Sequence, residues 1–251
     1  MKDEPGPLHL TGKWLILSDV HLPYQDNAAL TLALNHGVAS GCQGVVLNGD
    51  IVDFYQLSRF SRDPSQFGVR DEIECWRAFA ETLRELWPEK GALIYKRGNH
   101  EMRLESYLAA HAPELYDLAD LSFQSLMGFE DLGIVQAGVR PIKAGALNIL
   151  HGHEFGESIF SPVNPARGAF LRTKASTVIG HHHQPSHHSE NTLDGNPTGC
   201  WSTGCLCQLN PDYRPFAYTK WAHGFAEVES EQNGGFELRN YRIIDGKVRP
   251  A

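Results

Sequence analysis

Several short apolar runs in this chain stop abruptly at a glycine or a polar cluster. The clearest covers residues 45–47, valine and leucine, and leads directly into Asn48, Gly49 and Asp50. An unbroken run of this kind is typical of a strand buried on both faces, and such strands belong to sheets that helices cover. Glycine lets the backbone turn, so that Asp50 projects from the carboxyl end of the strand, where open α/β sheets bind ligands. Taken alone, Asp50 also fits an ordinary turn or a helix cap.

Four more predicted strands end in the same way. These strands are residues 14–17, 92–97, 146–150 and 176–179, and they lead into Ser18-Asp19-Val20-His21, Gly98-Asn99-His100-Glu101, His151-Gly152-His153 and Gly180-His181-His182-His183. Helical spacing of apolar residues predicts helices over 27–36, closed by Gly37, and over 71–87, 102–110 and 113–127. The order strand, helix, strand predicts a parallel sheet, which would bring the polar ends to one side.

The remaining chain predicts a single domain over 1–251, with a loose lead-in over 1–12, loops over 54–70 and 184–199, and a helical insertion over 101–130. The loop over 54–70 is rich in aromatic residues and arginine, and it fits either a substrate lip or an insertion packed on the body. Strands around 201–208, 225–229 and 236–243 alternate and contain aromatic residues, which indicates a second, mostly antiparallel sheet.

The composition narrows the class of protein. A chain of 251 residues with 41% hydrophobic residues can bury a core, and a net charge of −8 argues against a protein that coats nucleic-acid phosphates indiscriminately. Residues 1–10 lack a signal-peptide pattern and no apolar stretch approaches a membrane span, so we expect a soluble, cytoplasmic protein with no membrane partner. Five cysteines, an odd number, fit a reducing compartment.

The cysteines Cys200, Cys205 and Cys207 have a spacing that suggests zinc. A fourth ligand is missing, however, and Cys205 and Cys207 would lie on one buried strand face, where cysteine acts as a small apolar residue. The thirteen histidines are the stronger sign of metal chemistry, because imidazole is the commonest protein ligand for metals.

The polar strand ends together offer seven metal ligands, which is too many for one ion. Shared around Asp50 they make two sites: one of Asp19, His21, His183 and Asp50, and one of Asn99, His151, His181 and Asp50. Such a nitrogen and oxygen set suits two divalent transition ions, manganese foremost, with iron or zinc as alternatives. Two such ions about 3.5–4 Å apart are a common apparatus for displacement at phosphorus.

The chain resembles the calcineurin-like metallophosphoesterase superfamily, and the resemblance covers residues 14–183. The family's five blocks appear in order as Asp19-Val20-His21, Gly49-Asp50-Ile51-Val52-Asp53, Gly98-Asn99-His100-Glu101, His151, and Gly180-His181-His182-His183. The resemblance implies a four-layer α/β/β/α sandwich of two mixed sheets flanked by helices. It also implies hydrolysis of a phosphate ester by in-line attack of a hydroxide that bridges two metal ions. His153 is an alternative to His151 as the ligand of the fourth block.

Within the same pattern, His100 is expected to protonate the leaving group, with Glu101 or Asp53 as the carboxylate that orients it. A plain hydrogen bond from His100 to the backbone is the alternative. Asp53 is also expected to support Asp50.

The expected substrate is a phosphodiester, in a nucleotide or nucleic acid, because four cationic residues would form a basic rim beside the metals: Arg103, Arg167, Arg172 and Lys174. These residues fit solvated surface charges equally well. A phosphomonoesterase, including a protein phosphatase, is the alternative enzyme. A non-catalytic scaffold of the same fold is a remote alternative, because none of the seven ligands is missing.

Overall fold

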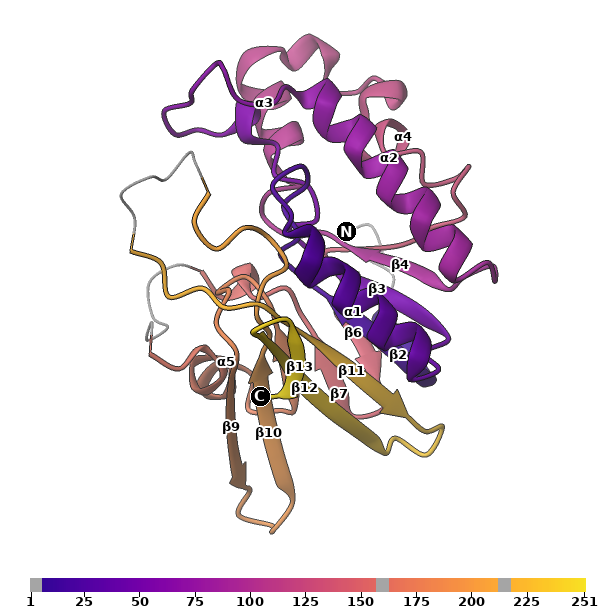
Figure 1. Ribbon diagram of the computed structural model, residues 1–251, viewed down its shortest axis with the longest axis vertical. Helices are drawn as coiled ribbons and strands as arrows, with labels where there is room; N and C mark the ends of the chain where they lie inside the picture. Colours follow the sequence, from indigo (N-terminus) through magenta and orange to yellow (C-terminus); the bar gives the residue numbers. More distant parts are fainter. Residues whose placement is uncertain (1–5, 157–162, 212–217) are drawn as a thin grey trace.

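The computed structural model describes residues 6–156, 163–211 and 218–251. Two mixed β-sheets pack face to face with helices outside them, which confirms the predicted α/β/β/α sandwich (Figure 1). The first sheet has seven strands, in the order β13 (Lys247–Pro250), β12 (Phe236–Ile244), β11 (Gly224–Ser230), β2 (Gly12–Leu17), β3 (Gly44–Asn48), β4 (Leu93–Lys96) and β5 (Val135–Gly138). The second has six, in the order β1 (Leu8–Leu10), β6 (Ile142–Ala144), β7 (Leu147–Ile149), β8 (Thr177–Ile179), β10 (Pro197–Ser202) and β9 (Ser186–Asn191).

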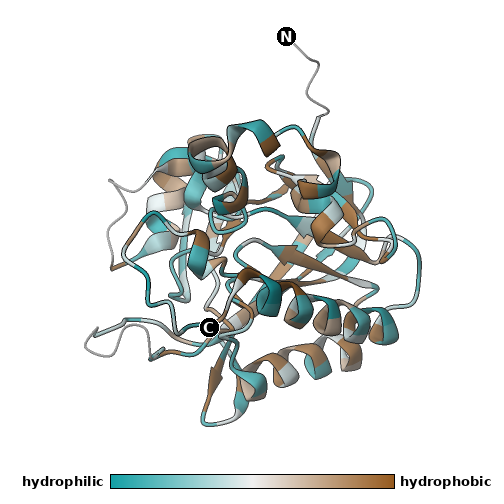
Figure 2. Ribbon diagram, turned by 90° about the horizontal axis from the view of Figure 1, so that it is seen from above, coloured by the Kyte–Doolittle hydropathy of each residue, from teal (hydrophilic) through white to brown (hydrophobic). Residues whose placement is uncertain are grey.

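The helices form the two outer layers. Two long ones, α1 (Asn27–Ala39) and α2 (Val69–Leu86), pack on the seven-stranded sheet, and α5 (Pro165–Thr173) packs on the six-stranded sheet. Two shorter ones, α3 (Arg103–His111) and α4 (Phe123–Leu126), follow β4. Single 3₁₀ turns cover Tyr55–Leu57, Pro113–Leu115, Ala119–Leu121 and His153–Phe155. In Figure 2 the helices show both teal and brown surfaces, whereas the strands between them are largely brown.

Alternation along β2 explains how one strand serves two cores. Leu15 and Leu17 face the core beneath α1 and α2, while Trp14 and Ile16 face the core between the sheets. Successive side chains of a strand point to opposite faces, so a continuous apolar run is what a doubly covered strand requires. Burial of each such side chain contributes about 1.5–3 kcal/mol.

The polar strand ends meet at an edge that both sheets share. In the seven-stranded sheet β2, β3 and β4 run parallel, with Leu17 beside Leu47 and Leu47 beside Tyr95. In the six-stranded sheet β7 and β8 run parallel, with Ile149 beside Val178. The expectation of one parallel sheet is therefore corrected, because the five ends come from two sheets.

A side chain on β3 joins these two sets of strand ends. The amide of Asn48 donates a 2.9 Å hydrogen bond from Nδ2 to the carbonyl of Leu150, which ends the strand segment before His151. This bond joins the two sheets, and it fixes the position of one set of strand ends relative to the other.

The C-terminal third differs from the prediction. Strands β11 and β12 do not form a second sheet, since β11 pairs antiparallel with β2 and extends the first sheet. The tract over 184–199, expected as a loop, contains β9 and the start of β10, which pair as an antiparallel hairpin. The polar sequence misled the prediction because β9 is an edge strand whose side chains are mostly exposed.

Three smaller predictions also need correction. The lead-in over 1–12 contains β1, which pairs with β6, a strand that the prediction missed. Gly37 does not close α1 but lies inside it, where a Cβ would come within 2.7 Å of Leu15 Cδ2; the helix therefore sits close to the sheet. The predicted helix over 113–127 is two 3₁₀ turns and the short α4.

Among the described helices, none has the length and apolar character to cross a bilayer.

A buried carboxylate, Glu227 on β11, ties α1 to the sheet. It is 2% exposed and accepts hydrogen bonds from Ser40 Oγ and, at 3.1 Å, from Tyr241 OH. Lys13 Nζ lies 3.9 Å away and His36 Nε2 lies 3.5 Å away. Burial raises the pKa of Glu227, but the hydrogen bond from Ser40 and the charge of Lys13 outweigh burial and lower it overall.

This network generates a stability prediction for Glu227→Gln. Because the folded pKa is depressed, the ionised carboxylate stabilises the fold above the ordinary carboxyl pKa of about 4.3, and this stabilisation is lost as the pH falls through the folded value. We expect the variant to lose about 1–3 kcal/mol of unfolding free energy at pH 7. Urea unfolding of both proteins should show that the difference shrinks below about pH 4. A difference that stays constant would contradict this account.

Candidate metal centre

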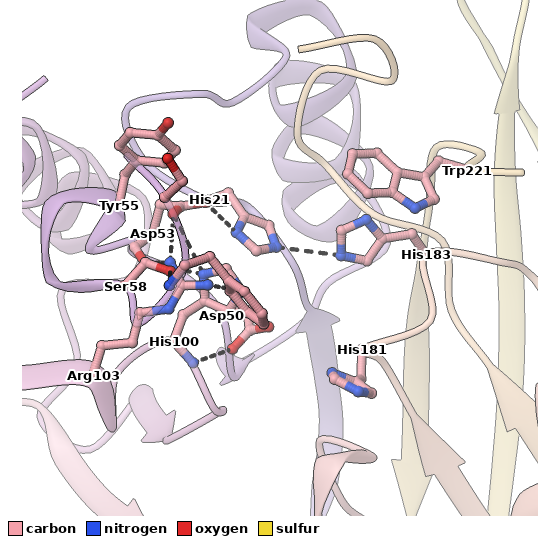
Figure 3. Close-up of a pocket in the computed structure, with 12 residues that line it drawn as sticks. His21, Asp50, Asp53, Tyr55, Ser58, His100, Arg103, His181, His183 and Trp221 are labelled. Atoms are coloured by element: carbon pink, nitrogen blue, oxygen red, sulfur yellow. Dashed lines mark hydrogen bonds and ion pairs between the residues drawn. The ribbon is translucent and has the colours of Figure 1, made fainter. Parts of the chain in front are cut away.

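Three of the predicted ligands converge on one point between the sheets. His21 Nε2 and His183 Nε2 lie 3.2 Å apart, and His183 Nε2 lies 3.1 Å from Asp19 Oδ1. Figure 3 shows His21 and His183 reaching toward each other from opposite sides of the cavity. Two imidazole nitrogens and a carboxylate oxygen therefore face one another at distances that suit ligands of a shared cation.

A second convergence lies around Asp50. Its Oδ2 is 3.2 Å from His151 Nε2, and ligand atoms of Asp50, His151 and His181 all lie within 4.8 Å of one another. Asp50 also belongs to a second such group, with His21 and His100. The structure thus brings Asp50 next to ligands of both predicted sites.

Buried polar atoms without hydrogen-bond partners test whether these residues fit metal ions. Within the described chain five candidate ligands have such an atom: Asp19 Oδ1, Asn99 Oδ1, His151 Nε2, His181 Nδ1 and, on the alternative to His151, His153 Nδ1. Asp19 Oδ1 and His151 Nε2 have the close neighbours given above, but the alignment is not that of a hydrogen bond. A buried polar atom is costly unless a partner satisfies it. Cations would satisfy the first four, so the donor set fits two divalent ions.

The backbone at the ligands is strained. Eight non-glycine residues of the described chain have positive φ, and five of them are predicted ligands: Asp19, His21, Asp50, His181 and His183. The left-handed region is unfavourable for residues with a Cβ, and such strain gathers at functional sites. It turns successive side chains toward one point, which a regular strand could not do.

Two glycines allow the loops to approach so closely. A Cβ on Gly98 would overlap Asp50 Oδ1 and lie 3.0 Å from His151 Nε2, and one on Gly180 would overlap Ser18 Oγ and lie 2.6 Å from Asp19 Oδ2. Glycine is therefore needed after these strands because there is no room for a Cβ, as well as for the turn.

The electrostatics favour a cation at this point. Burial raises the pKa of Asp50, but His100 and His151 outweigh burial and hold it well below its usual range. The same balance, with His183 as the main partner, lowers the pKa of Asp19. Burial, followed by the charge of His151, lowers the pKa of His181 to about 3, which keeps that imidazole neutral, as a metal ligand must be.

One backbone carbonyl and one carboxylate orient two of the histidine ligands. His151 Nδ1 lies 2.7 Å from the carbonyl of Asn48, and His21 Nδ1 lies 2.9 Å from Asp53 Oδ2. Each contact leaves the opposite ring nitrogen, Nε2, facing the centre. This is the usual way in which proteins fix the tautomer of a metal-binding histidine.

Glu101 contacts the backbone rather than His100. Its carboxylate accepts hydrogen bonds from the N–H groups of Gly98, Asp50 and Ile51, at 2.7, 3.0 and 2.8 Å, and from Tyr95 OH at 2.8 Å. It therefore fastens the loop after β4 to the loop after β3. Of the two carboxylates expected to orient His100, only Asp53 lies beside the ring.

His100, Asp53 and Arg103 form a second cluster at the wall of the cavity. His100 Nδ1 lies 3.0 Å from the carbonyl of Asp53 and 3.5 Å from its Oδ1, and Arg103 donates to both oxygens at 2.9 Å. Arg103 NH2 lies 3.1 Å from His100 Nε2. Burial lowers the pKa of His100, but Asp50 and Asp53 outweigh burial and raise it overall.

The centre opens into a cavity of about 580 Å³. Its lining also includes Trp221 and four residues of the loop over 54–70: Tyr55, Ser58, Phe60 and Ser61. The centroids of the Trp221 and His183 rings lie 4.3 Å apart. No local pattern marks Trp221, whereas the aromatic loop over 54–70 had already suggested a substrate lip.

Most of the residues expected to form a basic rim do not line the cavity. Arg103 lines the cavity, but Arg167, Arg172 and Lys174 are exposed on α5 or at its end, outside the lining formed by the described residues. His153 belongs to none of the described groups of convergent ligand atoms, although the centre of its ring lies 5.3 Å from that of His151. Cys207, expected as a small apolar residue, is buried with Sγ 3.9 Å from His183 Nδ1.

The fold and this centre define a two-sheet α/β protein with a histidine, aspartate and asparagine site at a shared sheet edge. The chain belongs to the calcineurin-like phosphoesterase family, whose model matches residues 12–214. It is similar to the gene 54 protein of Mycobacterium phage D29, at 26% identity over 230 residues, 87% of this chain and 89% of that protein.

Three solved structures are similar at lower identity. Vacuolar protein sorting 29 from Cryptosporidium parvum has 12% identity and a TM-score of 0.47, over 96% of this chain and 95% of that one. The phosphoesterase Yfce from E. coli has 15% and 0.45, over 94% and 96%. A cold-active protein-tyrosine phosphatase of Shewanella sp. has 14% and 0.44, over 98% and 82%.

The close approach at Gly98 yields a prediction. In Gly98→Ala the new methyl group would displace the Asp50 carboxylate, so we expect Mn²⁺ to bind at least about tenfold more weakly while the fold is kept. Calorimetric titration of the metal-free protein measures this. Gly6→Ala is the control, since nothing lies within 4 Å of a Cβ there. Equal affinity in all three proteins would contradict the geometry.

Proposed function

We propose that this chain is a phosphodiesterase that depends on two divalent metal ions. Membership of the calcineurin-like phosphoesterase family supports hydrolysis of phosphate esters with bound metal. The observation that supports the dinuclear centre is the position of Asp50, within reach of His21 on one side and of His151 and His181 on the other. A carboxylate between two ligand groups is suited to join two ions.

The proposed ligands are those of the sequence pattern. Asp19, His21 and His183 would hold one ion, Asn99, His151 and His181 the other, and Asp50 both. The oxygen and imidazole set suits Mn²⁺, which we propose as the working metal. Bound ions would supply a water acidic enough to attack at neutral pH and positive charge against the phosphoryl oxygens.

We propose that the cluster of His100 and Arg103 supplies the proton for the leaving group. With Nδ1–H directed at the carbonyl of Asp53 and Nε2 facing Arg103, His100 is neutral in the observed arrangement. Its Nε2 can carry and deliver a proton only when Arg103 turns away, because two donors cannot face each other. Asp53 contacts both side chains and favours the protonated ring, so it acts as the positioning carboxylate.

The preference for a diester rests on a second cavity. This cavity, of about 440 Å³, contains the candidate ligand Asn99, and both cavities are lined by Ser58, Phe60 and Arg103. A phosphate bound between them has a place for a substituent on either side. A diester has two substituents and a monoester has one, so this arrangement favours the diester over the phosphomonoesterase alternative.

A substrate panel tests the proposed function. With Mn²⁺ we expect the protein to hydrolyse bis-p-nitrophenyl phosphate at least about tenfold faster, in kcat/KM, than p-nitrophenyl phosphate, and to lose both activities in EDTA. Faster hydrolysis of the monoester would assign the protein to the alternative enzyme class. Absence of any metal-dependent hydrolysis, with the metals bound, would point to a scaffold.

The role of His100 is tested with leaving groups of different basicity. For His100→Ala we expect unchanged metal content and a loss of about 100-fold or more on a diester with an alkoxide leaving group. The loss should be much smaller for p-nitrophenolate, which leaves without a proton. His9→Ala, at an exposed site, is the control. An equal loss on both esters would argue against proton donation by His100.

A further inference from the structure

The second cavity is a groove between α3 and the loop before α2, and we call it the α3 groove. One wall consists of Met102, Arg103, Ser106, Tyr107, Ala110 and His111. These residues recur every three to four positions, so they form a single face of the helix. The other wall is the segment 57–60, and Asn99 and His153 lie in the lining as well.

The groove adjoins the candidate metal centre. Arg103, Ser58 and Phe60 line both cavities, and Asn99 is a proposed metal ligand. A group attached covalently to a phosphate at the metals can therefore reach the groove past these shared residues.

The groove exposes large apolar side chains. Phe60 is 65% exposed and Met102 is 40% exposed. The rings of Tyr107 and His111 lie 4.6 Å apart, and the guanidinium of Arg59 lies 5.1 Å from the centre of the Phe60 ring. Exposed apolar surface beside a polar centre is typical of a binding site.

The charged side chains of the groove indicate which kind of ring it would bind. No aspartate or glutamate occurs among its described lining residues, and the ionisable side chains there are Arg59, Arg103, Tyr107, His111 and His153. Aromatic faces together with arginine are the features with which proteins stack nucleobases. The volume of about 440 Å³ lies within the range of small-molecule sites, roughly 300–1,000 Å³.

We propose that the α3 groove is a nucleobase subsite, so that the preferred substrate is a phosphodiester of a nucleotide. The base stacks on the rings of Phe60 and Tyr107, and its phosphate lies at the metal centre. This inference rests on the proposed function for the position of the phosphate, but base recognition by the groove can be measured without turnover.

Binding of the product-like monophosphates tests the groove directly. By calorimetry at 4 °C with Mn²⁺, we expect the full chain to bind AMP about tenfold or more tightly than ribose 5-phosphate. Tyr107→Leu and Phe60→Leu should remove most of that difference, while Tyr116→Leu, at an exposed tyrosine outside the groove lining, should keep it. Circular dichroism checks that all variants fold.

The other outcomes are decisive in different ways. Equal affinity for AMP and ribose 5-phosphate would overturn the base subsite, and so would an equal loss for both in Tyr107→Leu. Tighter binding of O-phosphotyrosine than of AMP would overturn it in favour of a phosphoprotein side chain. Continuous heat from hydrolysis of AMP would refute the diester preference alone, and base recognition would then be read from the relative hydrolysis of AMP and ribose 5-phosphate.

Kinetics give a second test with a constant leaving group. We expect wild-type kcat/KM for thymidine 5′-p-nitrophenyl phosphate to exceed that for methyl p-nitrophenyl phosphate by about tenfold or more, and Tyr107→Leu to reduce this ratio toward one. An unchanged ratio in the variant would overturn the subsite. Absence of hydrolysis of both esters would instead count against the proposed function, and the calorimetric result would stand by itself.

Discussion

Buried carboxylates at the shared edge of two sheets are the constraint on which this structure depends. Asp19 and Asp50 are 0% and 2% exposed, and histidines rather than lysine or arginine surround them. Negative charge at such depth is strongly unfavourable unless cations balance it. Arg103 balances Asp53 at the rim, but within the described chain no lysine or arginine forms an ion pair with Asp19 or Asp50. The two proposed metal ions would supply that missing charge.

The rest of the fold serves to hold these groups together. The core between the sheets sets their separation, the bond from Asn48 to Leu150 fixes their relative height, and Glu101 joins two of the loops. Left-handed residues and glycines then turn the side chains inward. Strain at the ligands is tolerated because the preceding strands, which are largely buried, hold the loops in position.

Much of this could be predicted from sequence, because strand ends such as Gly49-Asp50 are local signals. Asp19 and His21 are such a signal too, but they converge because of their left-handed backbone beyond β2 and not because of strand alternation. The pattern could not reveal that β11 extends the first sheet, since its pairing with β2 joins residues over two hundred positions apart. The hairpin of β9 and β10 was hidden by its exposed polar face. The α5 cations failed as a rim because sequence order does not place a helix near a site, and the partners of Glu101 depend on backbone groups that no motif encodes.

Asp50 is the residue that we propose to join the two metal ions. Electron paramagnetic resonance of the metal-free protein titrated with Mn²⁺, with the bound metal counted by elemental analysis, tests this role most directly. We expect two ions per chain with a spin-coupled signal that disappears in Asp50→Asn and persists in Asp194→Asn, an exposed control. A single bound ion, or two ions without coupling in the wild-type protein, would contradict the account.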